Sequence, residues 1–376
     1  METPFVFGRI AVGKNFTNRQ KEIKRLIQNF TSGINTIIIS PRRWGKSSLV
    51  LKASDIVTKQ NKKIKIITLD LYNIRSEEEF YMALTKSVLK ISAGKLEEVI
   101  NYSKKFFKQW TPKISFSPDS QNEYNIGFEW SELKKQPDEV LNLAENIAIS
   151  KGIKMIICVD EFQNIGYFED PLAFQKKLRS HWQKHQSVTY CLYGSKRHML
   201  MNVFSSSSMP FYKFGDLMFL SKITPEHWGK YIVKRYNETE KEINAEDARY
   251  LSLLVEYHPY YVQQLAQLSW LRTETKTTVK IIDISLDSLI LQLSLLFQNI
   301  IENLNLTQLN FLKALVRGES QLSSKETINR YNLGTSANVI QIKKALIKKE
   351  IIDNPGKIIE ILDPVFAIWL KKYYFI

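Results

Sequence analysis

Short apolar runs alternate with amphipathic helical patterns along roughly the first 220 residues of the sequence. The apolar runs predict strands at Thr36–Ser40, Ile64–Leu71, Lys154–Glu161, Val188–Gly194 and Leu217–Ile223. The amphipathic patterns predict helices at Arg19–Phe30, Lys46–Lys59, Glu77–Ile91, Asp138–Lys151 and Leu172–His185. Strands that alternate with helices are typical of an α/β fold in which helices cover a parallel sheet. Functional residues are then expected in the loops that follow the carboxyl ends of the strands.

Residues 112–130 interrupt this alternation. Two segments there, KISFS and YNIGFE, alternate apolar and polar positions and flank a polar stretch. We therefore expect a β-hairpin inserted among the helices of the core.

The pattern after residue 222 is helical. Helices are expected to start at Thr224-Pro225 and at Asn244, where Asp247 follows, and to continue as Tyr260–Leu271 after His258-Pro259 and as Ile284–Asn303. Three further helices are expected at Thr307–Arg317, Ser324–Tyr331 and Ser336–Lys349, followed by a strand pair at Ile351–Asp353 and Ile358–Leu362. Three helices and a hairpin are typical of a winged helix-turn-helix. The sequence thus predicts a core at 1–222, a helical lid at 223–304 and a winged helix at 305–376.

The loop after the first predicted strand reads SPRRWGKSS and fits a P-loop with one departure. The P-loop pattern is G-x-x-x-x-G-K-[ST], and Ser40 stands where the first glycine is expected. Gly45 lets the backbone curl around phosphates, Lys46 is placed to reach the β- and γ-phosphate oxygens, and Ser47 can ligate Mg²⁺. The predicted nucleotide-binding residues of the loop are Ser40, Pro41, Arg42, Arg43, Trp44, Gly45, Lys46, Ser47 and Ser48.

Phosphoryl transfer also requires a metal anchor and a group that orients the attacking water. The segment MIICVDEFQN offers both, because an apolar strand ends there in two carboxylates. Asp160 is expected to hold Mg²⁺ together with Ser47 and water. Glu161 is expected to polarise the water that attacks the γ-phosphate.

A sensor of the γ-phosphate is expected at the end of the next strand. Ser195 stands there and could hydrogen-bond the γ-phosphate or the water, or it could instead cap the following helix. Arg179 and Arg197 are candidates for a charge-neutralising arginine. A solvated or DNA-facing role is the alternative for both arginines.

A pocket for the nucleotide base is expected near the N-terminus, in the segment Asn15–Arg19. Phe16 could pack against adenine while the backbone around Asn18 reads the edge of the base, next to Arg19. Alternatively, Phe16 is a hydrophobic staple and Asn18 a helix cap. In the lid, Pro259 could lie over the base or the phosphates when the domains close, or simply mark a bend.

Composition places the chain among ordinary globular proteins, with 44% hydrophobic and 24% charged residues. The N-terminus does not resemble a signal peptide and no apolar stretch approaches a membrane span. Cys158 and Cys191 both lie in predicted buried strands, which fits core residues in a reducing compartment. We therefore expect a cytoplasmic protein with no membrane partner.

The formal net charge is +15, and part of it is clustered. Residues 171–213 contain no acidic residue but seven basic ones, Lys176, Lys177, Arg179, Lys184, Lys196, Arg197 and Lys213. In the winged helix, Val339, Ile342 and Leu346 share one face of the third helix, and Asn338, Gln341, Lys344 and Lys348 share the other. Amide and lysine side chains on an exposed helix suit contacts with base edges and phosphates of duplex DNA. A solubility surplus for the charge, and interdomain packing for the winged helix, are the alternatives.

The ordered set NFTNRQKEIKRL, SPRRWGKSS, VDEFQNI, YGSKRHML, HPYYVQQL and LDPVFAIWL resembles the archaeal-type ATPases of the STAND class. These are AAA+-related P-loop ATPases of archaea and many bacteria. The resemblance implies a P-loop core of the ASCE type, a helical lid, a C-terminal winged helix and a nucleotide-dependent switch. It also implies ATP as the nucleotide, with Asp160 and Glu161 in the Walker B roles and Ser195 as the sensor. Tyr257 departs from the lid motif of the family, which carries glycine before His258-Pro259.

Three functions are consistent with these residues. The first is an ATP hydrolase that works as a conformational switch, with a possible nucleotide-dependent oligomer. The second is a DNA-binding ATPase similar in layout to origin-recognition factors, which would use the winged helix and the basic segment. The third is a scaffold in stress or defence signalling whose nucleotide turnover depends on a protein partner.

Overall fold

The computed structural model describes residues 3–92, 113–116, 124–127, 137–354 and 358–376. The chain divides into two compact units. One unit, called here the sheet unit, consists of residues 19–220. The other, called the lid unit, consists of residues 1–18 and 221–376.

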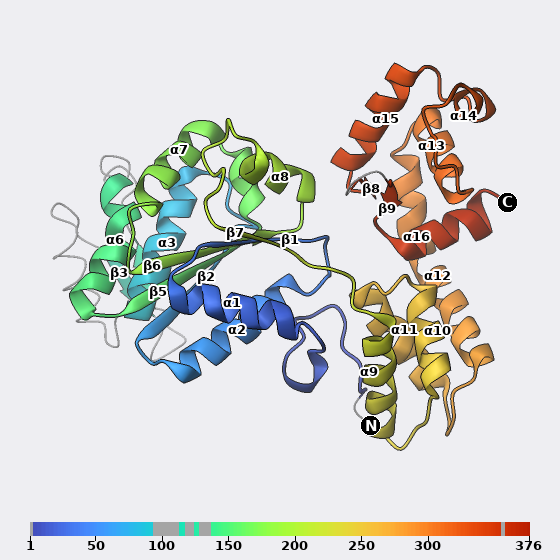
Figure 1. Ribbon diagram of the computed structural model, residues 1–376, viewed down its shortest axis with the longest axis horizontal. Coiled ribbons are helices and arrows are strands. Elements are labelled where there is room, and N and C mark those ends of the chain that lie inside the picture. Colours follow the sequence, from blue (N-terminus) through green and yellow to red (C-terminus); the bar gives the residue numbers. More distant parts are fainter. Residues whose placement is uncertain (1–2, 93–112, 117–123, 128–136, 355–357) are drawn as a thin grey trace. The chain divides into compact units, whose positions relative to one another are not determined.

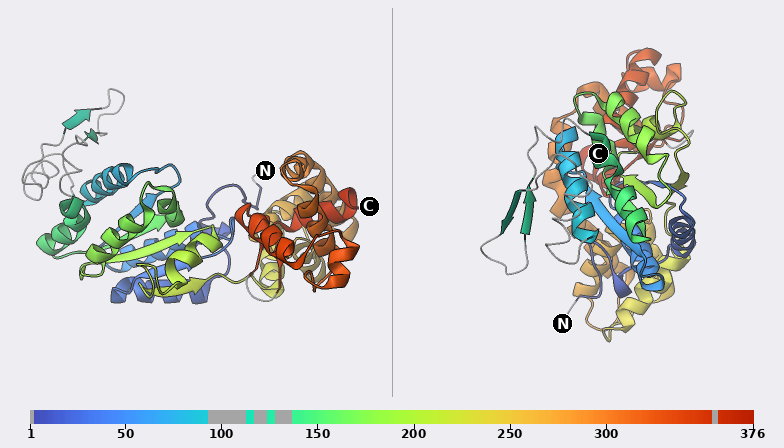
Figure 2. Two further views of the ribbon diagram at one scale, coloured as in Figure 1. Left: turned by 90° about the horizontal axis from the view of Figure 1, so that it is seen from above. Right: turned by 90° about the vertical axis from the view of Figure 1, so that its left-hand side faces the viewer.

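A five-stranded parallel sheet with the order β2-β5-β6-β1-β7 forms the centre of the sheet unit (Figure 1). The strands are β1 (Thr36–Ile39), β2 (Ile64–Asp70), β5 (Lys154–Asp160), β6 (Val188–Gly194) and β7 (Asp216–Phe219). The helices are α1 (Gln20–Ser32), α2 (Lys46–Gln60), α3 (Glu77–Ser92), α6 (Pro137–Lys151), α7 (Pro171–Trp182) and α8 (Arg197–Ser205), with a 3₁₀ segment η2 (Phe162–Tyr167). Helices α1 and α2 cover one face of the sheet, and α3, α6 and α7 cover the other (Figures 1 and 2). The predicted α/β fold is confirmed.

Burial along the strands follows their places in the sheet. Every residue of β1 and β6 is buried, as expected for inner strands of a parallel sheet that is covered on both faces. The edge strand β2 instead alternates buried and exposed residues. The two cysteines, Cys158 and Cys191, are buried and stand opposite each other in the register of β5 and β6.

The main differences between the predicted and observed elements of this unit concern β7, α7 and α8. Strand β7 begins at Asp216 and ends at Phe219, so the predicted extension to Ile223 is wrong. The chain passes into the lid unit at Ser221, which explains why pairing with β1 stops there. Helix α7 ends at Trp182 rather than at His185, and the helix expected after Ser195, for which no bounds were predicted, is α8.

The segment predicted as an inserted hairpin contains two paired strands. Strands β3 (Lys113–Phe116) and β4 (Tyr124–Gly127) are antiparallel, with Ile114 opposite Ile126. The connection between them, and the rest of 112–130, lies outside the described residues.

The lid unit is mainly helical. Its elements are η1 (Gly13–Asn15), α9 (Pro225–Asn237), α10 (Ala245–Leu254), α11 (Pro259–Arg272), α12 (Val279–Glu302), α13 (Leu306–Val316), α14 (Lys325–Arg330), α15 (Ser336–Lys348), β8 (Ile352–Asp353), β9 (Glu360–Ile361), α16 (Pro364–Trp369) and a π-helical turn η3 (Leu370–Tyr374). Strands β8 and β9 pair antiparallel. Helices α13, α14 and α15 followed by this pair form the predicted winged helix-turn-helix.

The predicted lid and winged helix share one hydrophobic core. The ring of Phe297 in α12 lies 5.3 Å from that of Phe366 and 5.7 Å from that of Trp369, both in α16. The Tyr261 hydroxyl in α11 donates a hydrogen bond to Asp363, whose carboxylate also caps α16. The boundary predicted after residue 304 therefore falls inside a single compact unit.

Several local expectations for the lid unit need correction. Thr224 precedes α9, but its hydroxyl contacts His227 Nδ1 at 2.9 Å rather than capping the helix backbone. Helix α12 begins at Val279, five residues before the predicted start, because the Thr278 side chain accepts a hydrogen bond from the Ile281 N–H and caps it. An isolated parallel bridge joins Glu242 to Lys276 within the otherwise helical lid.

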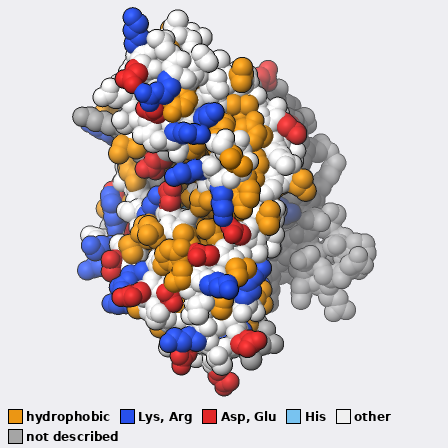
Figure 3. Space-filling model, turned by 90° about the vertical axis from the view of Figure 1, so that its right-hand side faces the viewer, with side chains coloured by type: hydrophobic (Ala, Val, Ile, Leu, Met, Phe, Trp, Pro, Cys, Tyr) orange, Lys and Arg blue, Asp and Glu red, His pale blue; other side chains and the backbone are white. Residues whose placement is uncertain are grey.

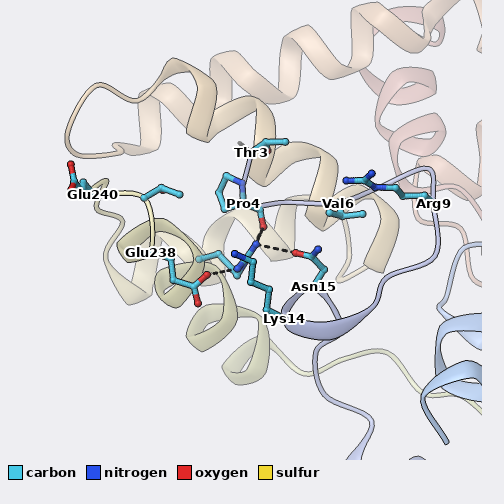
Figure 4. A pocket seen from close by; sticks show the side chains of 10 residues that line it. Thr3, Pro4, Val6, Arg9, Lys14, Asn15, Glu238 and Glu240 are labelled. Carbon is cyan, nitrogen blue, oxygen red and sulfur yellow. Dashed lines mark hydrogen bonds and ion pairs between the residues drawn. The ribbon is translucent and has the colours of Figure 1, made fainter. Parts of the chain in front are cut away.

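The N-terminal segment belongs to the lid unit, whereas the sequence placed it with the core. The Phe5 ring packs 5.7 Å from the ring of Tyr236, and the buried Arg235 guanidinium donates to the Pro4 carbonyl at 2.7 Å and to Asn15 Oδ1 at 2.9 Å. A cavity of about 380 Å³ lies beside these contacts (Figure 4). Because Arg235 is held by these partners and by Glu238, it ties the segment to α9.

None of the helices that the structure describes is both long enough and apolar enough to cross a membrane.

Candidate functional site

The P-loop joins β1 to α2 across residues 40–45. Gly45 is the N-cap of α2 and has a φ of 85°, a left-handed value that favours glycine. Ser40 keeps a φ outside the left-handed region, so this position makes no conformational demand for glycine. Arg43 does adopt a left-handed φ of 62°. The serine that departs from the pattern is therefore compatible with the loop.

Lys46 points back into the loop. The side chain is buried, and its Nζ donates to the Ser40 carbonyl at 3.2 Å and to the Pro41 carbonyl at 3.0 Å. The first N–H groups of α2 have no intrahelical partner and form an anion-binding end. Lys46 and this helix end thus place positive charge at the same loop.

Asp160, the last residue of β5, comes together with Ser47 in the first turn of α2. The Ser47 hydroxyl donates to Asp160 Oδ2 at 2.8 Å, and the Glu161 N–H donates to Asp160 Oδ1 at 2.8 Å. Burial raises the pKa of Asp160 above its ordinary value, although the Ser47 hydrogen bond opposes this shift. A hydroxyl and a carboxylate are hard oxygen ligands of the kind that Mg²⁺ prefers. The described residues contain no group of three or more His, Cys, Asp or Glu side chains that could hold a metal, so water and phosphate would complete the ligand set here.

Glu161 follows Asp160 and adopts a left-handed φ of 50°. Its Oε2 accepts a hydrogen bond from the Ser195 hydroxyl at 3.1 Å and another from Gln163 Nε2. Ser195 is not the cap of α8, because that cap is Lys196 and it makes no side-chain capping bond. The alternative reading of Ser195 as a helix cap is therefore wrong, and the structure brings the predicted sensor to Glu161.

Arg19 lies beside the P-loop. It is 4% exposed, and its guanidinium donates to the Trp44 carbonyl at 3.4 Å and to Glu22 Oε1 at 3.0 Å. Burial lowers the pKa of Arg19 from its ordinary value. Arg19 is also the N-cap of α1, so the alternative prediction that Asn18 caps this helix is wrong.

The remaining residues predicted to contact the nucleotide belong to the lid unit. Phe16 and Asn18 lie in the segment that packs on α9, and Pro259 is the first residue of α11. Tyr257 stands where the resembling family carries glycine, and its φ of 62° is left-handed. The contacts of these residues with a base stay a prediction.

The two candidate arginines pack on aromatic rings. The Arg179 guanidinium lies 4.9 Å from the centre of the Phe214 ring, and burial lowers its pKa. The Arg197 guanidinium lies 5.5 Å from the centre of the Phe219 ring. Arg197 follows β6 and Phe219 ends β7, and these two strands lie on either side of β1. The contact between Arg197 and Phe219 therefore spans the end of β1. Arg197 is thus the nearer of the two to the P-loop strand.

Sequence reasoning missed Gln163 and Gly194. A β carbon on Gly194 would lie 1.9 Å from Gln163 Oε1, so the glycine provides the space for the amide. The signal available in the sequence was the amide of Gln163 in the segment VDEFQN, which stands two residues after Glu161, the candidate catalytic glutamate.

The winged helix exposes the face predicted for DNA. Asn338, Gln341, Lys344 and Lys348 of α15 are exposed, and Val339, Ile342 and Leu346 are buried. On the face shown in Figure 3, basic side chains are interspersed with acidic and hydrophobic ones. The basic segment of the sheet unit is partly paired, because Lys177 contacts Glu77 at 2.9 Å and Lys196 contacts the Tyr167 hydroxyl at 3.0 Å.

Comparison with known proteins supports this fold. Residues 295–372 match the family model described as a probable winged helix domain. No curated protein matches the sequence.

Solved structures resemble the chain over nearly its whole length. A Walker-type ATPase of Pyrococcus abyssi is 16% identical, with a TM-score of 0.68 over 98% of this chain and 100% of that one. The ORC2 protein of Aeropyrum pernix, solved as ADPNP and ADP complexes, is 13% identical, with a TM-score of 0.58 over 96% and 94%. The ORC1 protein of the same organism, solved with DNA, is 11% identical, with a TM-score of 0.51 over 100% and 99%. At these identities the likeness shows the fold, which is that of a P-loop ATPase with a C-terminal winged helix.

Proposed function

We propose that the chain binds ATP with Mg²⁺ and hydrolyses it as a nucleotide-dependent switch. The observation that carries this proposal is the hydrogen bond from Ser47 to Asp160, with Glu161 held beside it. Asp160 ends β5, Glu161 follows it and Ser47 lies in the first turn of α2, and phosphoryl transfer needs these three residues at one place. The resemblance to the archaeal-type ATPases of the STAND class favours ATP as the nucleotide.

Each residue has a defined part in the proposed reaction. Lys46 and the N–H groups at the start of α2 bind the β- and γ-phosphate oxygens. Ser47 and Asp160 hold Mg²⁺, which when bound neutralises charge on the phosphate oxygens. Glu161 accepts a hydrogen bond from the attacking water and orients it.

The water oxygen forms a bond to the γ-phosphorus while the bond from that phosphorus to the bridging oxygen breaks. ADP leaves with the electron pair of the broken bond, and the proton of the water passes toward Glu161 or a phosphate oxygen. Ser195 is the proposed γ-phosphate sensor, because it contacts the same carboxylate that orients the water. Phe16, Asn18, Arg19 and Pro259 remain the proposed contacts for the rest of the nucleotide, with Arg19 acting on the P-loop backbone.

The test is ATP binding and turnover, measured with and without duplex DNA, in the wild type and in Lys46→Ala. The variant should bind ATP roughly 10- to 100-fold more weakly, because it loses charge-assisted hydrogen bonds to phosphate. Lys52→Ala, which removes a lysine from the same helix outside the P-loop, is the matched control and should bind ATP as the wild type does. Equal ATP affinity in Lys46→Ala and the wild type would contradict the proposal.

A second candidate function is a DNA-binding ATPase. The exposed amide and lysine face of α15 favours it, since such side chains suit base edges and phosphates. In this version the nucleotide cycle regulates the presentation of α15 to duplex DNA. Stimulation of ATP turnover by DNA would support it, whereas turnover that is indifferent to DNA would favour a protein partner as the regulator.

A further inference from the structure

The carboxylate of Glu161 is held asymmetrically. Its Oε2 accepts hydrogen bonds from Ser195 and from Gln163. No described residue donates a hydrogen bond to its Oε1. One oxygen is therefore fixed by two protein donors, and the other remains available to accept a hydrogen bond from water.

Gln163 is itself fixed by its neighbours in η2. The preceding Phe162 is fully buried, with its ring 5.4 Å from that of Phe211. The following Asn164 donates from Nδ2 to the Leu71 carbonyl at 2.9 Å. Both sides of Gln163 are thus anchored, which leaves its 1%-exposed amide little freedom to rotate away from Glu161.

Gly194 provides the space into which this amide fits. A β carbon at Gly194 would lie 1.9 Å from Gln163 Oε1 and 3.0 Å from its Cδ, well inside contact distance. Gly194 has no positive φ that would demand glycine for the backbone. The absence of a side chain at position 194 therefore serves the packing of Gln163.

The Oε1 atom of Gln163 is buried without a hydrogen-bond partner among the described residues. Leaving a buried amide oxygen unpaired is unfavourable. A hydrophobic side chain of similar size would avoid this cost, so fold stability alone does not explain an amide here. The donor bond to Glu161 is the contribution that only the amide makes.

We propose that Gln163 is a positioning residue. Together with Ser195 it fixes Glu161 Oε2, so that Oε1 accepts a hydrogen bond from the attacking water. The glycine at position 194 leaves the space that the Gln163 amide occupies. This inference rests on the proposed ATP hydrolysis by Glu161. Gln163 touches neither nucleotide nor water in this account. It acts through the orientation of the glutamate.

The test compares Gln163→Ala, Gly194→Ala and the double variant with the wild type. Gln163→Ala should lower kcat about 10- to 100-fold, because a misplaced catalytic group costs that much, while the ATP dissociation constant stays within about threefold. Gly194→Ala should lower kcat similarly by displacing the amide, and it should also lower the thermal unfolding midpoint. In the double variant the midpoint should recover toward that of Gln163→Ala, and kcat should equal that of Gln163→Ala without further loss.

Gln175→Ala is the matched control, because Gln175 is also buried with an unpaired Oε1 but belongs to α7 and is not one of the two side chains that donate to Glu161. It should leave kcat unchanged. If Gln163→Ala does not fold, Gln163→Met keeps the volume while removing the donor and should show the same loss of kcat.

The outcomes separate this inference from the function on which it rests. If Glu161→Gln abolishes turnover while Gln163→Ala and Gln163→Met keep wild-type kcat, only the positioning role is wrong. The positioning role would also be overturned if the losses of kcat from the two single variants multiplied in the double variant. It would be overturned as well if the thermal unfolding midpoint of the double variant did not recover. If the wild type does not hydrolyse ATP, both proposals fail, although the recovery of the midpoint would still test the packing of Gln163 on Gly194.

Discussion

Ser40 and Tyr257 both stand where a glycine is expected, but their backbone φ angles differ. Ser40 has a φ outside the left-handed region, so serine carries no strain there. Tyr257 has a φ of 62°, which disfavours a side chain by roughly 1–2 kcal/mol. Hydrogen bonds from the Tyr257 N–H to Ser252 and from the His258 N–H to Val255 hold this turn. The sequence shows both departures, but only the backbone angles show which of them requires a compensating contact.

His185 gives a prediction at the residue scale that is independent of the nucleotide. Burial lowers the pKa of His185 to about 4, although Glu145 opposes the shift. The folded state therefore binds the proton less well than the unfolded state, whose histidine has a pKa near 6.5. The free energy of unfolding should fall by about 1–2 kcal/mol between about pH 7.5 and pH 5 through this residue.

Denaturant unfolding at the two pH values measures this effect. His185→Gln should show a smaller loss of stability on acidification than the wild type. An unchanged pH dependence in His185→Gln would contradict the assignment.

Element by element, the strongly periodic segments were predicted well and the ends of the sheet less so. Strand β6 and the start of α2 fall where the apolar pattern and the P-loop put them. The end of β7 was wrong because the sequence remains apolar to Ile223 while the chain leaves the sheet after Phe219. The 3₁₀ turn η2, which brings Gln163 to Glu161, has no periodic pattern because it is short. The Ser47 and Asp160 pairing was predicted from motifs, whereas the Gln163 and Gly194 contact needs three-dimensional packing.

Helix α15 carries the prediction for DNA. Lys344→Gln and Lys348→Gln should together weaken duplex DNA binding and reduce the slope of log affinity against log salt by about 2, since each phosphate contact contributes roughly 0.9. Fluorescence anisotropy across a salt series measures both quantities. Lys280→Gln, at an exposed position of α12, removes one charge elsewhere in the same unit and should change neither.

A loss of affinity that is equal for Lys280→Gln and for the α15 variants would indicate a general charge effect. Unchanged binding in the α15 variants would rule out this face as the contact. Substitutions are preferable to removing residues 305–376, because that deletion would uncover Phe297 and the core that α12 shares with α16.

At the scale of the whole molecule, the chain passes between its two units twice, at residues 18–19 and 220–221. In the sheet unit, both crossings are hydrogen-bonded to the P-loop strand or to the loop itself. Arg19 donates to the Trp44 carbonyl at 3.4 Å, and the Leu220 N–H donates to the Ile39 carbonyl at 3.4 Å. A change of the P-loop on nucleotide binding would therefore act next to both connections, which suits a switch.

The lid unit would respond as one body. Its lid helices and winged helix share a core, and Tyr261 joins α11 to the cap of α16. Any reorientation of the lid then carries α15 with it. The sequence predicted the three regions, but the common core depends on Phe297, Phe366 and Trp369 meeting in space.

We propose that Glu161 turns a nucleotide-binding loop into a hydrolytic site. ATP binding and ATP turnover should be measured on the same preparations of wild type and Glu161→Gln. The variant keeps the shape of the side chain and removes its charge, so ATP affinity should stay within about twofold while turnover falls by at least about 100-fold. Turnover in Glu161→Gln close to that of the wild type would contradict the account.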